Sequence, residues 1–129
     1  MISMAAHNFP SGPWVGFYTY AGSKRKYMMD LMLEFKKEKM TGEGADGVGM
    51  FIISGSYSSA SGECSWVKQY TGRHAVDYKG YREGKGIWGN WTLTQARGGF
   101  HIWPLSEGGP ANAAKQKEKR AKPQLASAK

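Results

Sequence analysis

Short glycine-bearing turns separate a series of aromatic and β-branched runs along most of this 129-residue chain. Such runs predict β-strands, and connections this short favour antiparallel neighbours, because a parallel pair needs a long crossover. The seven predicted strands are residues 14–20, 27–37, 47–57, 64–70, 74–81, 86–94 and 99–105, with an eighth if Gly55 divides the third of them. The sequence therefore predicts an all-β protein built as an antiparallel up-and-down meander.

A meander of seven to eight strands has two outer edges to protect, and closure into a small barrel removes both. The chain contains 18 glycines, which permit the bends that closure needs, and 13% of its residues are Phe, Trp or Tyr, which can fill the interior. We expect residues 1–109 to form a single β-barrel domain.

Residues 27–37 fit two interpretations. The odd positions from 27 to 35 are all apolar, as in a strand with one buried face. Met28, Leu31, Met32 and Phe35 also fit a helical stripe, and a helix here would change the fold class to α+β. We favour the strand, because the flanking segments resemble hairpin turns.

The formal net charge of +8 is concentrated near the C-terminus. Residues 110–129 carry six Lys or Arg and one Glu, so five of the eight net positive charges lie there. This segment lacks aromatic and β-branched residues, which predicts a disordered basic tail able to attract nucleic acid only non-specifically. The single cysteine, the lack of a basic-then-apolar leader and the lack of a long apolar run predict a cytoplasmic protein with no membrane span.

Four polar side chains form the main candidate ligand-binding set. Lys68 and Tyr70 share one face of a predicted strand, and His74 and Tyr78 share one face of the next strand. The short turn between these strands predicts that they pair, which would bring the four side chains together. They could orient a ligand in the barrel mouth, form an internal hydrogen-bonded network, or decorate an outer face.

Other motifs carry weaker predictions. Residues 42–47 match Gly-x-Gly-x-x-Gly, but a strand follows instead of a helix, so we expect a hairpin loop and no dinucleotide. Glu43 and Asp46 lack the spacing of a calcium loop. Cys64 is expected to be a plain strand residue. With no acid–base pair of definite spacing, we expect no enzymatic activity and no catalytic residues.

The histidines offer one conceivable cofactor. A zinc site needs several ligands at defined spacing, and no such pattern is present, so we expect no metal site. Haem can be held by a single histidine, so His74 or His101 is conceivable as an axial ligand, although no cofactor is the main expectation.

The start of the first strand resembles a known group of barrels. Gly12-Pro13-Trp14 is similar to the Gly-x-Trp signature of the calycin-like barrels, which include lipocalins, fatty-acid-binding proteins and avidin-type proteins. The all-hairpin layout is closest to the avidin type. The resemblance implies that Trp14 plugs one end of the barrel.

A longer pattern resembles small uncharacterised bacterial β-barrel proteins of unknown function. It comprises Trp14-x-Gly16-x-Tyr18, Asp46-x-x-Gly49-x-Phe51, the alternation from Lys68 through Tyr70, Gly72, His74, Val76 and Tyr78 to Gly80, Gly89-x-Trp91 and residues 100–104. Together these features predict a non-enzymatic binding module for a small apolar or aromatic ligand inside the barrel. The alternative is a structural or protein-interaction domain with a filled barrel and no ligand.

Overall fold

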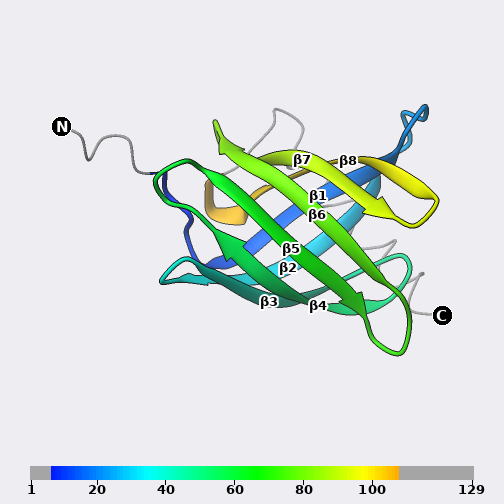
Figure 1. The fold of residues 1–129 in the computed structure, drawn as a ribbon, viewed down its shortest axis with the longest axis horizontal. Helices are drawn as coiled ribbons and strands as arrows, with labels where there is room; N and C mark the ends of the chain where they lie inside the picture. The colour runs from blue at the N-terminus through cyan, green and yellow to red at the C-terminus, as the bar shows by residue number, and fades with distance from the viewer. Residues whose placement is uncertain (1–6, 108–129) are drawn as a thin grey trace.

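The computed structural model describes residues 7–107, which form a closed antiparallel β-barrel of eight strands (Figure 1). The strands are β1 (Gly12–Tyr20), β2 (Tyr27–Lys36), β3 (Lys39–Asp46), β4 (Met50–Tyr57), β5 (Glu63–Tyr70), β6 (Ala75–Glu83), β7 (Gly86–Leu93) and β8 (Ala96–Pro104), and a short 3-10 turn, η2 (Leu105–Glu107), follows. Each strand pairs with its neighbour in sequence, and β8 returns to pair with β1. The predicted all-β meander and its closure are confirmed. The predicted basic tail, residues 110–129, lies outside the described residues.

Residues 27–36 form a strand, so the alternative helix is wrong. Among residues 7–107 there is no helix long and apolar enough to cross a membrane.

The eighth strand arises at β3 and not from a break at Gly55, which lies within β4. The turn before β3 contains no glycine: Lys37 and Glu38 adopt φ values of 50° and 67°, a conformation that usually calls for Gly or Asn. The expected hairpin loop at residues 42–47 is therefore also wrong. Residues 42–46 belong to β3, and the turn comes after Asp46.

Alternate residues of the strands point inward and form one core. In β5 the buried positions are Cys64, Trp66, Lys68 and Tyr70, as the period of two requires. Aromatic rings occupy the middle of the barrel, where Trp66 stacks on Tyr78 at 5.3 Å between ring centroids and Phe100 packs against both.

The segment before β1 covers one end of the barrel. Trp14 is 2% exposed there, and its Nε1 donates a hydrogen bond to the carbonyl oxygen of Pro10 at 2.9 Å. The Arg82 guanidinium lies 5.7 Å from the Trp14 ring and donates to the carbonyl oxygen of Asn8. Phe9 packs on Phe35 at 5.2 Å. Trp14 is therefore buried beneath this segment, and its role as a calycin-type plug stays a prediction.

Inward-facing glycines let the backbones of neighbouring strands approach closely. A Cβ built on Gly89 would lie 1.9 Å from the carbonyl oxygen of Lys79 and 2.5 Å from the Cα of Gly80. Both of these are backbone atoms of β6, so they cannot rotate away as a flexible side chain would. A residue without a Cβ, glycine, is therefore required at this position for β6 and β7 to pair.

We expect Gly89→Ala to lower the free energy of unfolding by about 2 kcal/mol or more, because the added methyl group would force β6 and β7 apart. Urea denaturation followed by tryptophan fluorescence would measure the change. Gly47→Ala is the matched control, since a Cβ at Gly47 meets nothing within 4 Å. Equal stability of the two variants would contradict the close approach of the strands.

Candidate functional site

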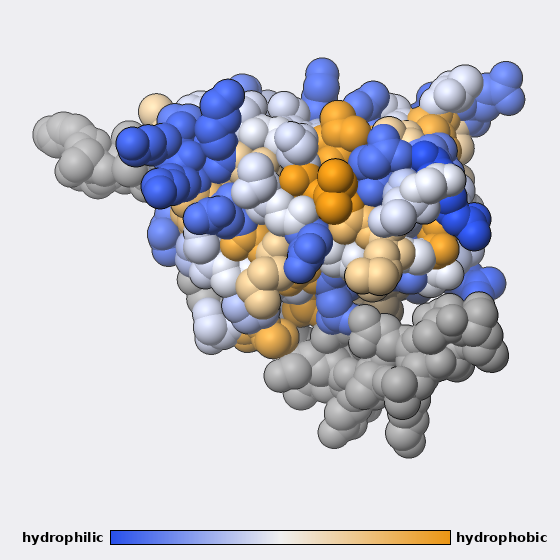
Figure 2. Space-filling view, turned by 90° about the horizontal axis from the view of Figure 1, so that it is seen from below, coloured by the Kyte–Doolittle hydropathy of each residue, from blue (hydrophilic) through white to orange (hydrophobic). Residues whose placement is uncertain are grey.

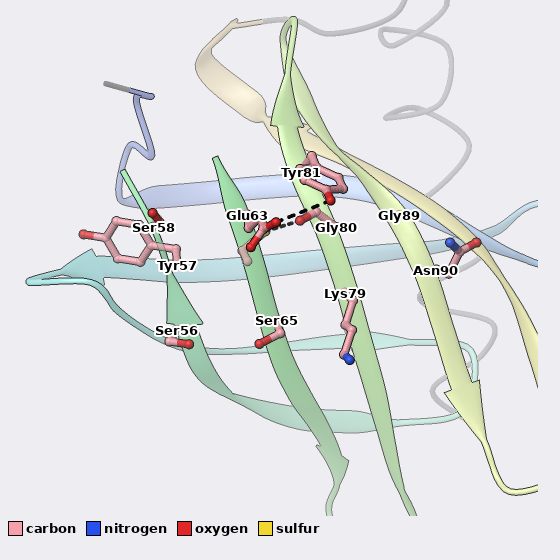
Figure 3. Close-up of a pocket in the computed structure, with 11 residues that line it drawn as sticks. Ser56, Tyr57, Ser58, Glu63, Ser65, Lys79, Gly80, Tyr81, Gly89 and Asn90 are labelled. Carbon is pink, nitrogen blue, oxygen red and sulfur yellow. Dashed lines mark hydrogen bonds between the residues drawn. The ribbon is translucent and has the colours of Figure 1, made fainter. Parts of the chain in front are cut away.

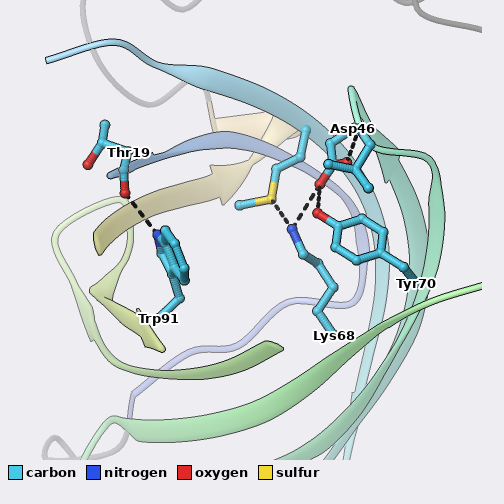
Figure 4. A network of polar contacts seen from close by, with 7 residues as sticks. Thr19, Asp46, Lys68, Tyr70 and Trp91 are labelled. Carbon is cyan, nitrogen blue, oxygen red and sulfur yellow. Dashed lines mark hydrogen bonds and ion pairs between the residues drawn. The ribbon is translucent and has the colours of Figure 1, made fainter. Parts of the chain in front are cut away.

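The barrel interior contains a buried ion pair. Lys68, on β5, places its Nζ 2.8 Å from Oδ2 of Asp46 at the end of β3, and both side chains are at most 2% exposed (Figure 4). The hydroxyl of Tyr70 donates to the same Oδ2 at 2.6 Å. The backbone N–H of Val48 donates to Oδ1 at 2.9 Å, so the carboxylate has partners on both oxygens. The pair thus joins β3 to β5 and also fixes the turn after β3.

Four aromatic rings surround the Lys68 ammonium. The rings of Tyr18, Phe51, Tyr70 and Tyr78 have their centroids 4.7 to 5.1 Å from Nζ. The sulfur of Met29 lies 3.9 Å from the same nitrogen. An ammonium in this position is stabilised by the electron-rich ring faces as well as by Asp46. The side chains of the protein itself therefore meet the needs of this buried charge.

Burial governs the protonation of these groups. Desolvation lowers the pKa of Lys68, and the attraction of the Asp46 carboxylate opposes that shift. Burial raises the pKa of Tyr70 well above its usual value, and donation of its proton to Asp46 adds to the effect. The pKa of Tyr78 is raised for the same first reason. Both phenols therefore stay neutral near pH 7 and act as hydrogen-bond donors or ring surfaces, not as bases.

The structure brings together three of the four predicted ligand-binding residues. Lys68, Tyr70 and Tyr78 meet inside the barrel, as described above. His74 precedes β6 and is exposed, although its ring lies 5.0 Å from that of Tyr70. Asp46 was not predicted as a member of this group. The period of two would have placed it inside with Met40 if residues 39–46 had been recognised as a strand.

Cys64 lies in a structural environment. Cys64 is buried, its thiol donates to the carbonyl oxygen of Gly80, and burial raises its pKa to about 12. Within residues 7–107, no three His, Cys, Asp or Glu side chains gather as a metal site would require.

His101 lies on the outside of the barrel. It stacks on Trp88 at 3.5 Å between ring centroids and lies opposite Phe17 in the pairing of β1 with β8. Burial, with a smaller contribution from the charge of Lys26, lowers its pKa to about 4. Since His101 is outside and His74 is exposed, neither imidazole faces the barrel interior, and the structure does not fit haem held there by either residue.

A groove lies on the outer surface of the barrel. It has a volume of about 610 Å³ and runs across β4 to β7 (Figure 3). Its lining residues are Ser56, Tyr57, Ser58, Glu63, Cys64, Ser65, Lys79, Gly80, Tyr81, Gly89 and Asn90. We call it the outer groove. A second concavity of about 580 Å³ lies at one end of the barrel, beside Tyr20, Gln95 and Arg97.

Strand register arranges the outer groove as two rows. Ser56, Ser65, Lys79 and Asn90 lie directly opposite one another across β4, β5, β6 and β7. The second row runs beside the first. Glu63 and Tyr81 line the groove, and Trp88, which is not one of its lining residues, lies opposite Tyr81 on β7. Tyr81 and Trp88 are 55% and 48% exposed, unusually high values for such large rings. Exposed aromatic rings beside a row of hydroxyl, amide and ammonium groups can bind a ligand that has both apolar and polar faces.

Comparison with known proteins gives no relative. No family model matches the chain, and neither the curated proteins nor the solved structures include a significant match. The structure itself shows an eight-stranded antiparallel barrel, while the calycin-like relationship stays a prediction from the sequence.

We expect Lys68→Met to lower the free energy of unfolding by about 3–5 kcal/mol, because it leaves the buried Asp46 carboxylate without its cation. Adding Asp46→Asn should recover part of the loss, since the remaining group is then neutral. Urea denaturation at pH 7 would measure both. Lys79→Met, an exposed lysine on the neighbouring strand, is the control and should change stability by less than about 0.5 kcal/mol. A similar cost for the two lysines would argue against the ion pair.

The lowered pKa of His101 predicts an acid-sensitive contribution to stability. Unfolded His101 takes up a proton near pH 6.5, whereas folded His101 does so only near its pKa of about 4. Stability should therefore fall as the pH drops from about 6.5 to 4, by about 3 kcal/mol from this residue, and His101→Gln should remove that part of the slope. Denaturation curves of both proteins at several pH values test this. Parallel pH profiles would show that His101 does not carry the effect.

Proposed function

We propose that this protein is a non-enzymatic binding domain whose filled barrel interior is structural and which recognises its ligand or partner at the outer groove. The supporting observation is the packing around Lys68. Its ammonium is enclosed by four rings and paired with Asp46, so the polar groups that the sequence suggested for orienting a ligand are engaged with one another.

The size of the inward-facing side chains supports the same proposal. Phe51 is 1% exposed, Tyr78 2% and Trp66 3%. An eight-stranded barrel has an interior just wide enough to be filled by side chains or to hold one small ligand. A ligand inside this barrel would need several of these rings to move. The ligand inside the barrel expected from the sequence stays a prediction, but the described geometry favours the filled-barrel alternative.

The outer surface offers a better recognition site. The face shown in Figure 2 carries hydrophobic side chains near its centre, with hydrophilic ones around them. The outer groove is concave and combines the exposed ring of Tyr81 with aligned polar side chains, and a second exposed ring, Trp88, lies opposite Tyr81.

Native mass spectrometry of the protein, isolated gently from the cells that make it, should give the mass of the bare polypeptide if the interior is structural. If a stoichiometric small molecule is retained, the double variant Tyr81→Ala/Trp88→Ala shows where it is held. Retention by both the wild type and this variant would place the molecule away from the outer groove and contradict the proposal. Loss from the variant alone would support binding at the groove.

A further inference from the structure

We propose that the outer groove binds an oligosaccharide that carries little or no net charge, laid across β5, β6 and β7 with the faces of its sugar rings on Tyr81 in the groove and on Trp88 beside it. This inference rests on the proposed function of the groove and names its ligand class. A pyranose ring presents C–H groups on one face and hydroxyl groups around its edge. A site for it therefore needs a flat aromatic surface and a set of donors and acceptors beside that surface.

The aromatic surface is supplied by Tyr81 and Trp88. They lie directly opposite each other in the pairing of β6 with β7, a relation that puts Cβ atoms about 5 Å apart. The indole of Trp88 is nearly parallel to the His101 ring, at 11°, so one face is covered and its orientation is fixed. The hydroxyl of Tyr81 lies 3.5 Å from Oε2 of Glu63. Because both rings are held in place on adjacent strands, their side chains lose little conformational freedom when a ligand binds to them.

The polar row supplies the hydrogen-bonding groups. Ser65, Lys79 and Asn90 lie two residues from Glu63, Tyr81 and Trp88 along their respective strands, so each has its side chain on the same outer face. Within residues 7–107, the side chains of Ser56, Ser65, Lys79 and Asn90 make no hydrogen bond or ion pair with one another or with other side chains. Hydroxyl, amide and ammonium groups together both donate to and accept from sugar hydroxyls.

The extent of the row favours several sugar units over one. Ser56 to Asn90 crosses four neighbouring strands, a span of about 14 Å at the usual strand spacing. The groove volume of about 610 Å³ is in the range of sites that hold small organic ligands.

Charge argues against polyanions as the occupant. The groove lining contains one lysine, Lys79, and one carboxylate, Glu63, so it has no excess of positive charge. Nucleic acids need several cationic contacts to phosphate, and a carboxylate in the same groove opposes them. An extended peptide usually adds to a free strand edge, which the closed barrel does not provide.

The test is titration of the full-length protein with cellohexaose, chitohexaose, maltohexaose, xylohexaose and mannohexaose, followed by isothermal calorimetry and tryptophan fluorescence. We expect at least one of these neutral chains to bind at a 1:1 ratio and to change the tryptophan emission. Absence of binding to every one of them at millimolar concentration would overturn the inference. So would tighter, salt-sensitive binding of heparin or single-stranded DNA that is lost from the Tyr81→Ala/Trp88→Ala variant, because it would mark the groove, and not the basic tail, as a site for polyanions.

Variants locate the binding and separate this inference from the proposed function. Tyr81→Ala and Trp88→Ala should each weaken sugar binding at least about tenfold, and Asn90→Ala should weaken it less. Met50→Ala, a 69% exposed apolar residue on β4 outside the groove lining, should leave it unchanged. Near-ultraviolet circular dichroism checks that each variant is folded. If no sugar binds but a natural ligand is lost from the Tyr81→Ala/Trp88→Ala variant, the sugar inference fails while the proposed function stands.

Discussion

The pairing of Lys68 with Asp46 is the interaction on which the rest of the interior depends. A lysine inside a small barrel is costly unless its charge is met, and here it is met by a carboxylate and by four ring faces. The pair requires that β3 end where its last residue can turn inward, and that Tyr70 be placed to donate to the same oxygen. Polar groups that are satisfied only in one arrangement specify that arrangement, so the network favours one strand register over its alternatives.

Because of this ion pair, the polar side chains inside the barrel are interpreted as structural groups. Clusters of Lys and Tyr at the mouth of a barrel often suggest a ligand site, because polar groups there would otherwise be unpaired. In this barrel the ammonium of Lys68 has protein partners, and the phenols of Tyr70 and Tyr78 are held neutral by burial. The chemistry that such a cluster offers to a ligand is then already used in holding the fold together.

The sequence was sufficient to predict the fold class, because glycine-bearing turns and alternating aromatic runs are local signals. It failed at β3, where Lys37 and Glu38 form a turn with positive φ and without glycine, and where Gly42 and Gly44 suggested a loop. Because the residues of β3 were assigned to a loop, Asp46 was not identified as the partner of Lys68. Lys68, Tyr70 and Tyr78 could be grouped from the period of two within paired strands. The outer groove could not be found in this way, since it depends on the register of four strands together.

Register is also what gives the outer surface its order. In a closed barrel each outward position has a neighbour on both sides, so a residue type that recurs at matched positions forms a continuous row. Here one row is polar, from Ser56 to Asn90, and the adjacent row passes from Glu63 through Tyr81 to Trp88. Under the proposed function, the side chains that fill the interior leave the outer face as the recognition surface. Because inward-facing aromatic residues fill the barrel, the proposed function assigns recognition to the aromatic residues that point outward.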